Sequence, residues 1–299
     1  MNAGANEETN DRQYGRPYTL NTSSDHGLPD VRDGLPIDWM PQLVAIDVDD
    51  TLTTWLGAVR PEVTEAVQRA QDAGVIVTLA TGRSVSTTVP VARSAGINDL
   101  IVCSNGAILA SSETEKVVEA VTFDPQPLVE QLMALVPDAV FAVEDLRGEF
   151  RTTHYFEAGA LGLSLEVAPL EEILAEPVTR LVVRSEGHAE QGFAAVAGNL
   201  GFHSVVFGVA DVAWMDVGPK GVNKSTMLAE LCARHGVDPT RTVAIGDYIN
   251  DIEMLKWAGL GVVMGHAPDS VRQHANAVTD PEPGIGVAAV LNAIADSRT

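Results

Sequence analysis

The chain has 299 residues, 45% of them hydrophobic and 20% charged, a composition typical of a globular protein with a substantial core. Its formal net charge of −22 argues against nucleic acid or an anionic membrane surface as a partner, because both attract basic patches. No apolar run approaches the ~20 residues of a membrane span, and the polar N-terminus lacks the apolar segment of a secretory signal. We therefore expect a cytoplasmic protein.

The predicted elements begin after a polar segment. Residues 1–38 are rich in Asn, Gly, Ser, Asp and Pro and show no periodicity, so we expect a disordered or loosely attached extension. Buried strands then alternate with amphipathic helices, a pattern that predicts a parallel sheet covered by helices. The first such elements are a strand at 43–46, a helix at 61–74, a strand at 75–80, a helix at 84–95 and a strand at 100–104.

The pattern changes after about residue 112. Shorter elements follow, and the regular alternation then returns near the C-terminus. These later elements are strands at 141–145 and 179–185, a helix at 222–235, and strands at 242–246 and 259–265. We therefore predict an α/β fold with a Rossmann-like core domain at 39–112 and 207–299, interrupted by an inserted α+β domain at 113–206.

Two polar segments follow predicted strands of the first half, at the edge of a parallel sheet where ligands bind. In the segment DVDDT, Asp47 and Asp49 share one face of an extended chain and would flank one reacting atom. Like charges this close disfavour ionisation, so the acids either lie in water as helix-cap or loop residues, or surround a cation. The second segment, Thr81-Gly82-Arg83, offers a hydroxyl group and a flexible backbone, and a plain helix-initiating turn is the alternative.

Two more segments belong to the second half of the predicted core. Lys224 lies in the first turn of a helix, against the helix dipole, which indicates a nearby anion unless the side chain is simply solvated. The segment GDYIND adds Asp247, Asn250 and Asp251 directly after the strand at 242–246. Two acidic loops behind two buried strands predict an oxygen-ligand site for Mg²⁺. A phosphate group bound to so acidic a chain needs local positive charge, which Lys224 would provide.

The ordered set DVDDT, TGR, GVNK and GDYINDIEML resembles the haloacid dehalogenase (HAD) superfamily of phosphohydrolases. The long insertion between the second and third segments is similar to that of the Cof-type, C2-capped branch. The stretches SNGA at 104–107 and GVVM at 261–264 support this resemblance, which covers residues 40–295. It implies a HAD core with a C2-type cap domain, and a Mg²⁺-dependent phosphatase that acts on small phosphorylated metabolites such as sugar phosphates.

The resemblance also implies roles for individual residues. Asp47 would be the nucleophile that forms an aspartyl-phosphate, and Asp49 would act first as general acid and then as general base. Arg83 would contact the substrate or pair with a carboxylate, and Asn250 would contact the phosphate or hold a neighbouring loop. The phosphate-binding residues implied are Thr81, Gly82, Arg83, Lys224 and Asn250. The Mg²⁺ ligands implied are Asp47, Asp49 through its backbone carbonyl, Asp247, and Asp251 as a ligand or an orienting residue.

Several points stay open from the sequence. His266 and Ile285 depart from residues usual in the family, which bears on loop packing or substrate choice. The insertion offers polar residues that either contact substrate or are merely solvated: Glu144, Asp145, Arg147, Glu149, Arg151 and His154. A phosphomutase would use the same two acids, and a non-enzymatic receiver-like switch also has an acidic Mg²⁺ pocket with Thr and Lys. The substrate and the oligomeric state are not predicted.

Overall fold

The computed structural model describes residues 30–31, 39–54, 57–154, 165–185, 203–209 and 212–298. Most of the predicted extension at 1–38 lies outside these residues. Within it, Asp30 forms a parallel bridge with Val278 and the side chain of Val31 is fully buried, so residues 30 and 31 are not loosely attached. None of the described helices combines the length and the apolar composition needed to cross a bilayer.

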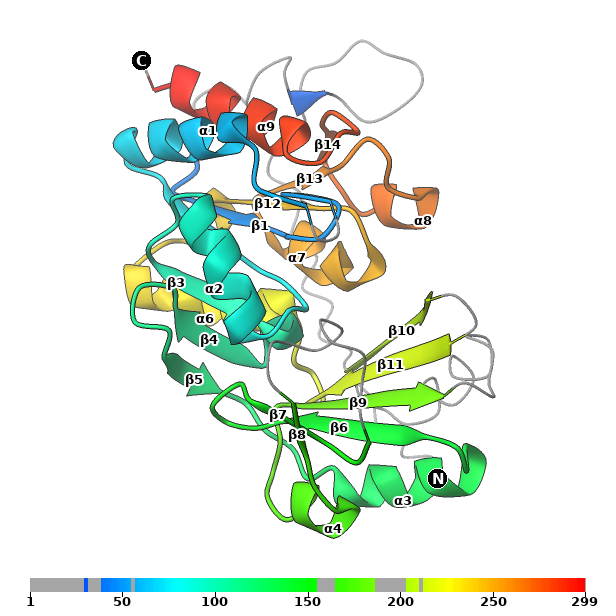
Figure 1. Cartoon of the computed structure of the whole chain (residues 1–299). Coiled ribbons are helices and arrows are strands. Elements are labelled where there is room, and N and C mark those ends of the chain that lie inside the picture. The colour runs from blue at the N-terminus through cyan, green and yellow to red at the C-terminus, as the bar shows by residue number, and fades with distance from the viewer. Residues whose placement is uncertain are drawn as a thin grey trace, which may run out of the picture.

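A five-stranded parallel sheet forms the centre of the core (Figure 1). Its strand order is β14-β13-β12-β1-β2, so the chain leaves β1 toward one edge and later returns to fill the other. The strands are β1 (Leu43–Ile46), β2 (Ile76–Leu79), β12 (Thr242–Gly246), β13 (Leu260–Val263) and β14 (Ala277–Val278). The connections after β1 and after β12 run toward opposite edges of the sheet, which makes the gap between these two parallel strands a topological switch point. Ligands bind at such points in folds of this kind.

Helices cover both faces of this sheet, which explains why its strands are continuously apolar. Val44 and Ile46 of β1 belong to one buried cluster, and Leu43 and Ala45 belong to another. The first cluster includes α1 (Pro61–Asp72), α2 (Val85–Ser94) and α9 (Ile285–Asp296). The second cluster includes α6 (Lys224–His235), α7 (Ile252–Trp257) and α8 (Asp269–Arg272). The predicted α/β class with a parallel core sheet is confirmed.

A smaller antiparallel sheet extends the core next to β2. It consists of β3 (Leu100–Cys103), β4 (Ile108–Ser111) and β5 (Val117–Ala120) in this order. A parallel bridge between Ala80 and Val102 joins β3 to the end of β2. A single 3₁₀ turn at Ser104–Gly106 links β3 to β4 and thereby projects toward the same edge of the core as the loop after β2.

The inserted segment folds around a six-stranded sheet of order β10-β11-β9-β6-β7-β8. Helices α3 (Gln126–Leu135) and α4 (Leu170–Ile173) lie on the side of this sheet away from the core (Figure 1). The strands are β6 (Val140–Glu144), β7 (Phe150–Thr152), β8 (Leu165–Val167), β9 (Arg180–Ser185), β10 (His203–Val209) and β11 (Val212–Gly218). Phe141, Val143 and Leu181 pack beneath the helices, so the alternate residues of these strands face the core.

The strand pairing does not coincide with the domain boundaries predicted at 112/113 and 206/207. β5 pairs with β4 of the core, whereas β11 pairs with β9 of the inserted sheet and β10 pairs in turn with β11, as far as Gly218. Short antiparallel strands occur on each side of both predicted junctions, so the change in sequence pattern does not show which sheet each strand joins. We therefore propose junctions near residues 122 and 218.

The contact between α7 and β13 generates a test of the core. A Cβ atom added at Gly261 would overlap the backbone carbonyl oxygen of Leu255, whereas one added at Gly218 would meet no atom within 4 Å. We expect Gly261→Ala to lower the free energy of unfolding by about 1–3 kcal/mol or more, because the backbone must shift. Gly218→Ala is the matched control and should change it little. Urea denaturation measures both, and equal effects would contradict this account.

Candidate active site

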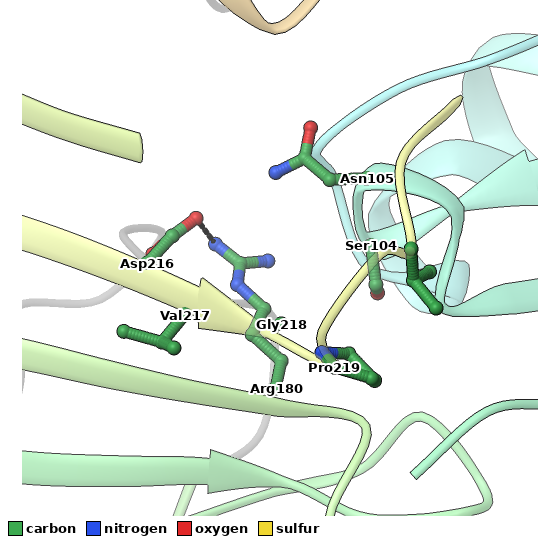
Figure 2. Close-up of a pocket in the computed structure, with 8 residues that line it drawn as sticks. Ser104, Asn105, Arg180, Asp216, Val217, Gly218 and Pro219 are labelled. Carbon is green, nitrogen blue, oxygen red and sulfur yellow. Dashed lines mark hydrogen bonds and ion pairs between the residues drawn. The ribbon is translucent and has the colours of Figure 1, made fainter. Parts of the chain in front are cut away.

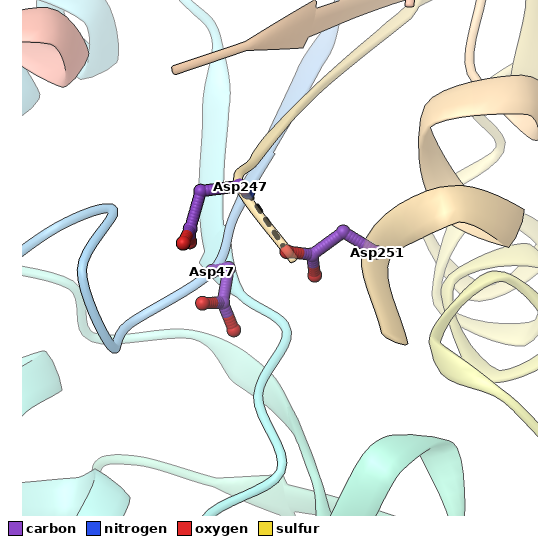
Figure 3. A group of neighbouring side chains, drawn as sticks. All are labelled: Asp47, Asp247 and Asp251. Carbon is purple, nitrogen blue, oxygen red and sulfur yellow. Dashed lines mark hydrogen bonds between the residues drawn. The ribbon is translucent and has the colours of Figure 1, made fainter. Parts of the chain in front are cut away.

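The acidic residues of two separate loops meet at the switch point of the core sheet. Asp47 directly follows β1 and Asp247 directly follows β12, and these two strands are hydrogen-bonded neighbours. Asp251 returns toward them from the turn before α7, and the three carboxylates converge (Figure 3). One oxygen from each of the three lies within 4.8 Å of the others. All three residues are buried, so the alternative of a solvated acidic loop is wrong for this cluster.

The ammonium group of Lys224 lies among these carboxylates. Its Nζ donates to Oδ1 of Asp47 at 2.5 Å and to Oδ1 of Asp251 at 2.6 Å, and its side chain is fully buried. Burial alone lowers the pKa of Lys224, but the Asp251 and Asp47 carboxylates outweigh it and raise the pKa above its usual range. Lys224 is therefore a buried cation, and the alternative of a solvated lysine is wrong.

The helix that carries Lys224 is fixed at its first residue. Asn223 caps α6, accepting hydrogen bonds from the backbone N–H groups of Ser225 and Thr226, and Thr226 completes the capping box. This cap holds Lys224 in the first helical turn, where the dipole is unfavourable for a cation. The carboxylates of Asp47 and Asp251 at hydrogen-bond distance offset that cost. They are the nearby anions that the position of Lys224 in the sequence indicated.

The other contacts of the cluster come from the backbone and from two nearby polar side chains. Asp251 accepts hydrogen bonds at Oδ2 from the N–H groups of Asp247 (2.9 Å) and Tyr248 (3.0 Å). Asp247 accepts one at Oδ1 from the Thr51 hydroxyl (2.6 Å), and Nε2 of His266 lies 3.4 Å from its Oδ2. Asp251 thus accepts three hydrogen bonds, one from Lys224 and two from the backbone, whereas Asp47 and Asp247 accept one each, so Asp47 and Asp247 are the better oxygen ligands and Asp251 is better suited to orient them.

The charge of this site is unbalanced. Three carboxylates face one ammonium group, which leaves two negative charges when all are ionised. Burial raises the pKa of Asp47 against the opposing effect of Lys224, and burial raises the pKa of Asp247 to about 6. Buried carboxylates that resist ionisation are stabilised by a cation between them. The donor set, hard oxygens with this excess charge, fits a divalent metal ion.

Asp49 and Arg83 form a pair beside the cluster rather than within it. Arg83 donates from Nε to Oδ2 of Asp49 at 2.9 Å and from Nη2 to Oδ1 at 2.5 Å, and both side chains are partly exposed. Pairing with a carboxylate was one of the two alternatives that the sequence left open for Arg83. The group of carboxylates in the described residues that could hold a metal ion does not include Asp49. If Asp49 is a metal ligand, as predicted, it would bind through its backbone carbonyl oxygen.

The remaining predicted residues lie on the neighbouring loops. Thr81 is buried at the end of β2, and its Oγ1 accepts a hydrogen bond from the backbone N–H of Arg83 at 3.1 Å. Asn250 donates from Nδ2 to Oδ1 of Asn105 at 3.0 Å, which agrees with the loop-holding alternative. The carbonyl of Gly82 accepts a hydrogen bond from Arg180 of the inserted sheet. The catalytic and binding roles of all these residues stay predictions.

Sequence reasoning missed four residues near this site. Thr51 is the last residue of the first acidic segment, DVDDT, and that position was its only signal. His266 was noted as a departure, yet it contacts Asp247. Arg180 and Asp216 pair with each other on the inserted sheet and gave no sequence signal, because each is an isolated charge in a strand. Of the polar candidates in the insertion, Glu144 alone is buried among the described residues, whereas Arg147 is an exposed partner of Asp145.

Comparison with known proteins identifies the class to which this fold and site belong. Residues 44–156 and 162–291 match the haloacid dehalogenase-like hydrolase family, so the chain belongs to that family. The predicted recognition, a Cof-type hydrolase of the HAD superfamily, and the predicted enzyme class, a phosphoric monoester hydrolase, are confirmed.

Particular relatives extend over nearly the whole chain. A 5-amino-6-(5-phospho-D-ribitylamino)uracil phosphatase of Bacillus subtilis is 28% identical, covering 84% of this chain and 96% of its own. A phosphoglycolate phosphatase of Methanopyrus kandleri is 30% identical, covering 84% of this chain and 96% of its own. A solved HAD phosphatase from Bacteroides thetaiotaomicron shares the fold with a TM-score of 0.71 and 24% identity, covering 87% of this chain and 97% of its own.

The raised pKa of Asp247 predicts a stability gain when its charge is removed. In metal-free buffer at pH 7 we expect Asp247→Asn to raise the free energy of unfolding by about 1–3 kcal/mol, because asparagine avoids burying an ionised group. The folded pKa of about 6 exceeds the usual 3.8, so acidification stabilises the wild type relative to the variant. The difference therefore shrinks as the pH falls through 6 and vanishes below 3.8.

Asp50→Asn is the matched control, because Asp50 is exposed in the loop after β1 and asparagine accepts its left-handed φ of 57°. Its effect on stability should be small at every pH. Chemical denaturation at several pH values measures the difference between each variant and the wild type. A gain in the free energy of unfolding for Asp247→Asn that does not depend on pH would contradict the raised pKa of Asp247.

Proposed function

We propose that the protein is a Mg²⁺-dependent phosphatase that hydrolyses small phosphorylated metabolites through an aspartyl-phosphate on Asp47. One observation carries the proposal: three buried carboxylates with a single buried ammonium group converge where two neighbouring parallel strands end. The relatives agree with this substrate class, since their names specify phosphoglycolate and a phosphoribitylamino-uracil, both small phosphate monoesters. A sugar-phosphate-like compound is the expected type of substrate.

The chain would bind the metal ion chiefly through Asp47 and Asp247, with the Asp49 carbonyl as a further ligand and Asp251 orienting the set. When bound, Mg²⁺ would neutralise carboxylate and phosphate charge together and so allow two anions to approach. Lys224 lies beside Asp47 and would provide the positive charge that a phosphate group requires in so acidic a protein. Thr81 and Arg83, at the end of the next strand, would contact other phosphoryl oxygens.

The proposed reaction proceeds in two steps at Asp47. A carboxylate oxygen of Asp47 attacks phosphorus while the bond to the leaving oxygen breaks, and Asp49 donates a proton to that oxygen. Asp49 then takes a proton from water, whose oxygen attacks phosphorus and releases inorganic phosphate together with the free Asp47 carboxylate. Because Arg83 holds the Asp49 carboxylate, substrate must replace part of this contact, which frees guanidinium N–H groups for the phosphate.

Substitution of the nucleophile tests the proposal. We expect Asp47→Asn to lower kcat for p-nitrophenyl phosphate by at least about 1,000-fold, because an amide cannot form the covalent intermediate. Asp50→Asn, in the same loop but exposed, should keep nearly full activity. Inorganic phosphate released in proportion to product distinguishes a phosphatase from a phosphomutase, which would return the group. Retained turnover by a folded Asp47→Asn protein would overturn the nucleophile assignment.

Metal removal gives an independent test. We expect a chelator to abolish turnover and Mg²⁺ to restore it, because the two excess negative charges then again have a counter-ion. Mg²⁺ should also raise the free energy of unfolding of the wild type, by about 2.7 kcal/mol at a hundredfold excess over Kd. Asp247→Asn should lose most of that stabilisation, and Asp50→Asn should retain it. Turnover in chelator at the wild-type rate would count against a metal-dependent site.

A further inference from the structure

The inserted sheet presents a charged cluster to the core at one place. Glu144 of β6 and Arg180 of β9 are directly opposite each other in the antiparallel register. Asp216 of β11 lies on the same face, because its neighbours Met215 and Val217 belong to the hydrophobic cluster under the helices. Figure 2 shows Arg180 and Asp216 beside a pocket whose opposite wall includes Ser104 and Asn105 of the core. The cluster therefore lies at the junction of the two sheets.

Arg180 joins the inserted sheet to the loop that follows β2. Its Nη1 donates to the carbonyl oxygen of Gly82 at 2.8 Å, its Nη2 forms an ion pair with Asp216, and its guanidinium lies 5.7 Å from the ring centroid of Phe150. Only 9% of Arg180 is exposed. A planar guanidinium with three fixed partners has little freedom, so it is well suited to hold a backbone carbonyl in one position.

Glu144 joins the same sheet to the turn that follows β3. Its Oε2 accepts a hydrogen bond from the Ser104 hydroxyl at 2.6 Å, and the residue is fully buried. Its other oxygen, Oε1, has no hydrogen-bond partner within the described residues. Burial raises the pKa of Glu144 to about 7, against the opposing charge of Arg180. A carboxyl group in this position costs stability, so its contact with Ser104 is not explained by stability alone.

The two core loops that receive these contacts form one unit. The N–H of Ser104 donates to the carbonyl of Arg83 at 2.9 Å, and the N–H of Asn105 donates to the carbonyl of Thr81 at 3.0 Å. Ser104 and Asn105 both have left-handed backbone angles, with φ of 50° and 52°. Such conformations are unfavourable without glycine and persist where surrounding contacts impose them. The contacts from the inserted sheet are therefore among those that hold the unit.

This unit carries two of the side chains proposed to bind phosphate. Thr81 and Arg83 lie on it, and Arg83 in turn holds the Asp49 carboxylate. Asn105 accepts the hydrogen bond of Asn250 from the acidic loop after β12. A shift of the unit by a fraction of an ångström would displace phosphate ligands and the proposed acid–base residue together, and phosphoryl transfer is highly sensitive to such displacement.

We propose that Arg180 and Glu144 are positioning residues for phosphoryl transfer: by docking on Gly82 and Ser104 they fix the paired loops that align Thr81, Arg83 and Asp49. The inference rests on the proposed phosphatase function and adds to it that residues of the insertion act on the chemical step. Neither residue needs to touch the substrate. Docking of the inserted sheet and alignment of the phosphate loops are then one event, because the same two contacts produce both.

The first test compares two arginines of the same strand and face. Arg180→Met removes the contact with Gly82, whereas Arg184→Met is the matched control, since Arg184 lies over the ring of Trp214, with its Cζ atom 5.8 Å from the ring centroid. We expect Arg180→Met to lower kcat for p-nitrophenyl phosphate by about 10- to 100-fold. KM should change by less than about threefold, because the substrate is not contacted. Equal kcat values for the two variants would overturn the proposal.

The second test separates alignment from folding at Glu144. Glu144→Gln keeps an acceptor for the Ser104 hydroxyl and should retain kcat within about threefold, whereas Glu144→Leu removes it and should lower kcat about tenfold or more. Glu144→Leu should unfold at the same temperature as the wild type or a higher one, since a buried carboxyl is replaced by a hydrophobic side chain. Equal kcat for both folded variants would overturn the proposal.

Ser104→Ala probes the same contact from the core side and covers the case in which Glu144→Leu does not fold. It removes the hydroxyl donor and should lower kcat several-fold at unchanged KM, and wild-type kcat would count against the proposal. Phosphatase activity of the wild type is measured first, because its absence would refute the proposed function itself. With an active wild type, full activity of Arg180→Met refutes only the positioning role.

Discussion

The buried ammonium group of Lys224 is the interaction on which the site depends. It lies within hydrogen-bond distance of both Asp47 and Asp251, so it lowers the repulsion between carboxylates that otherwise could not share a low-dielectric space. One ammonium group cannot balance three carboxylates, and the excess negative charge determines what else the site binds. Burial is the main cause of the raised pKa of both Asp47 and Asp247, and the neighbouring Asp251 carboxylate raises both further.

The fold brings these charges together by sheet topology, since Asp47 is 177 residues from Lys224 in the chain and farther still from Asp247 and Asp251. β1 and β12 are parallel neighbours in register from Leu43–Thr242 to Ile46–Ile245, so the residues after them emerge side by side. Both faces of the strands are buried by helices, which makes the strand ends rigid. The cap of Asn223 sets the start of α6, and from there the lysine side chain reaches the same point. The site is therefore preorganised by contacts that have no role in chemistry.

The sequence predicted the core well because its signals are local. Continuous apolar strands followed by acidic loops identified β1 and β12, and the expected strand at 43–46 matches β1 (Leu43–Ile46). The pairing of Asp49 with Arg83 could not be decided from the sequence, because an arginine directly after a strand suits a carboxylate partner and a bound anion equally well. Nothing in the sequence indicated that Arg180 and Asp216 interact. The two residues are 36 positions apart, and their pairing depends on the register of their strands and on the contact of the inserted sheet with the core. The sequence could not indicate which sheet β5, β10 and β11 join for the same reason, because strand pairing is non-local.

A common electrostatic arrangement recurs at two levels of the molecule. In the core, one lysine is shared by two buried carboxylates, and in the inserted sheet one arginine pairs with Asp216 while facing Glu144. The two cations differ in what their remaining N–H groups can do. The compact ammonium of Lys224 acts on Asp47 and Asp251 as a point charge, whereas the guanidinium of Arg180 extends a further N–H to the Gly82 carbonyl. That extra donor links an ion pair in the inserted sheet to the loop after β2, for which we propose phosphate binding, so the choice of arginine over lysine at 180 is a matter of geometry rather than of charge.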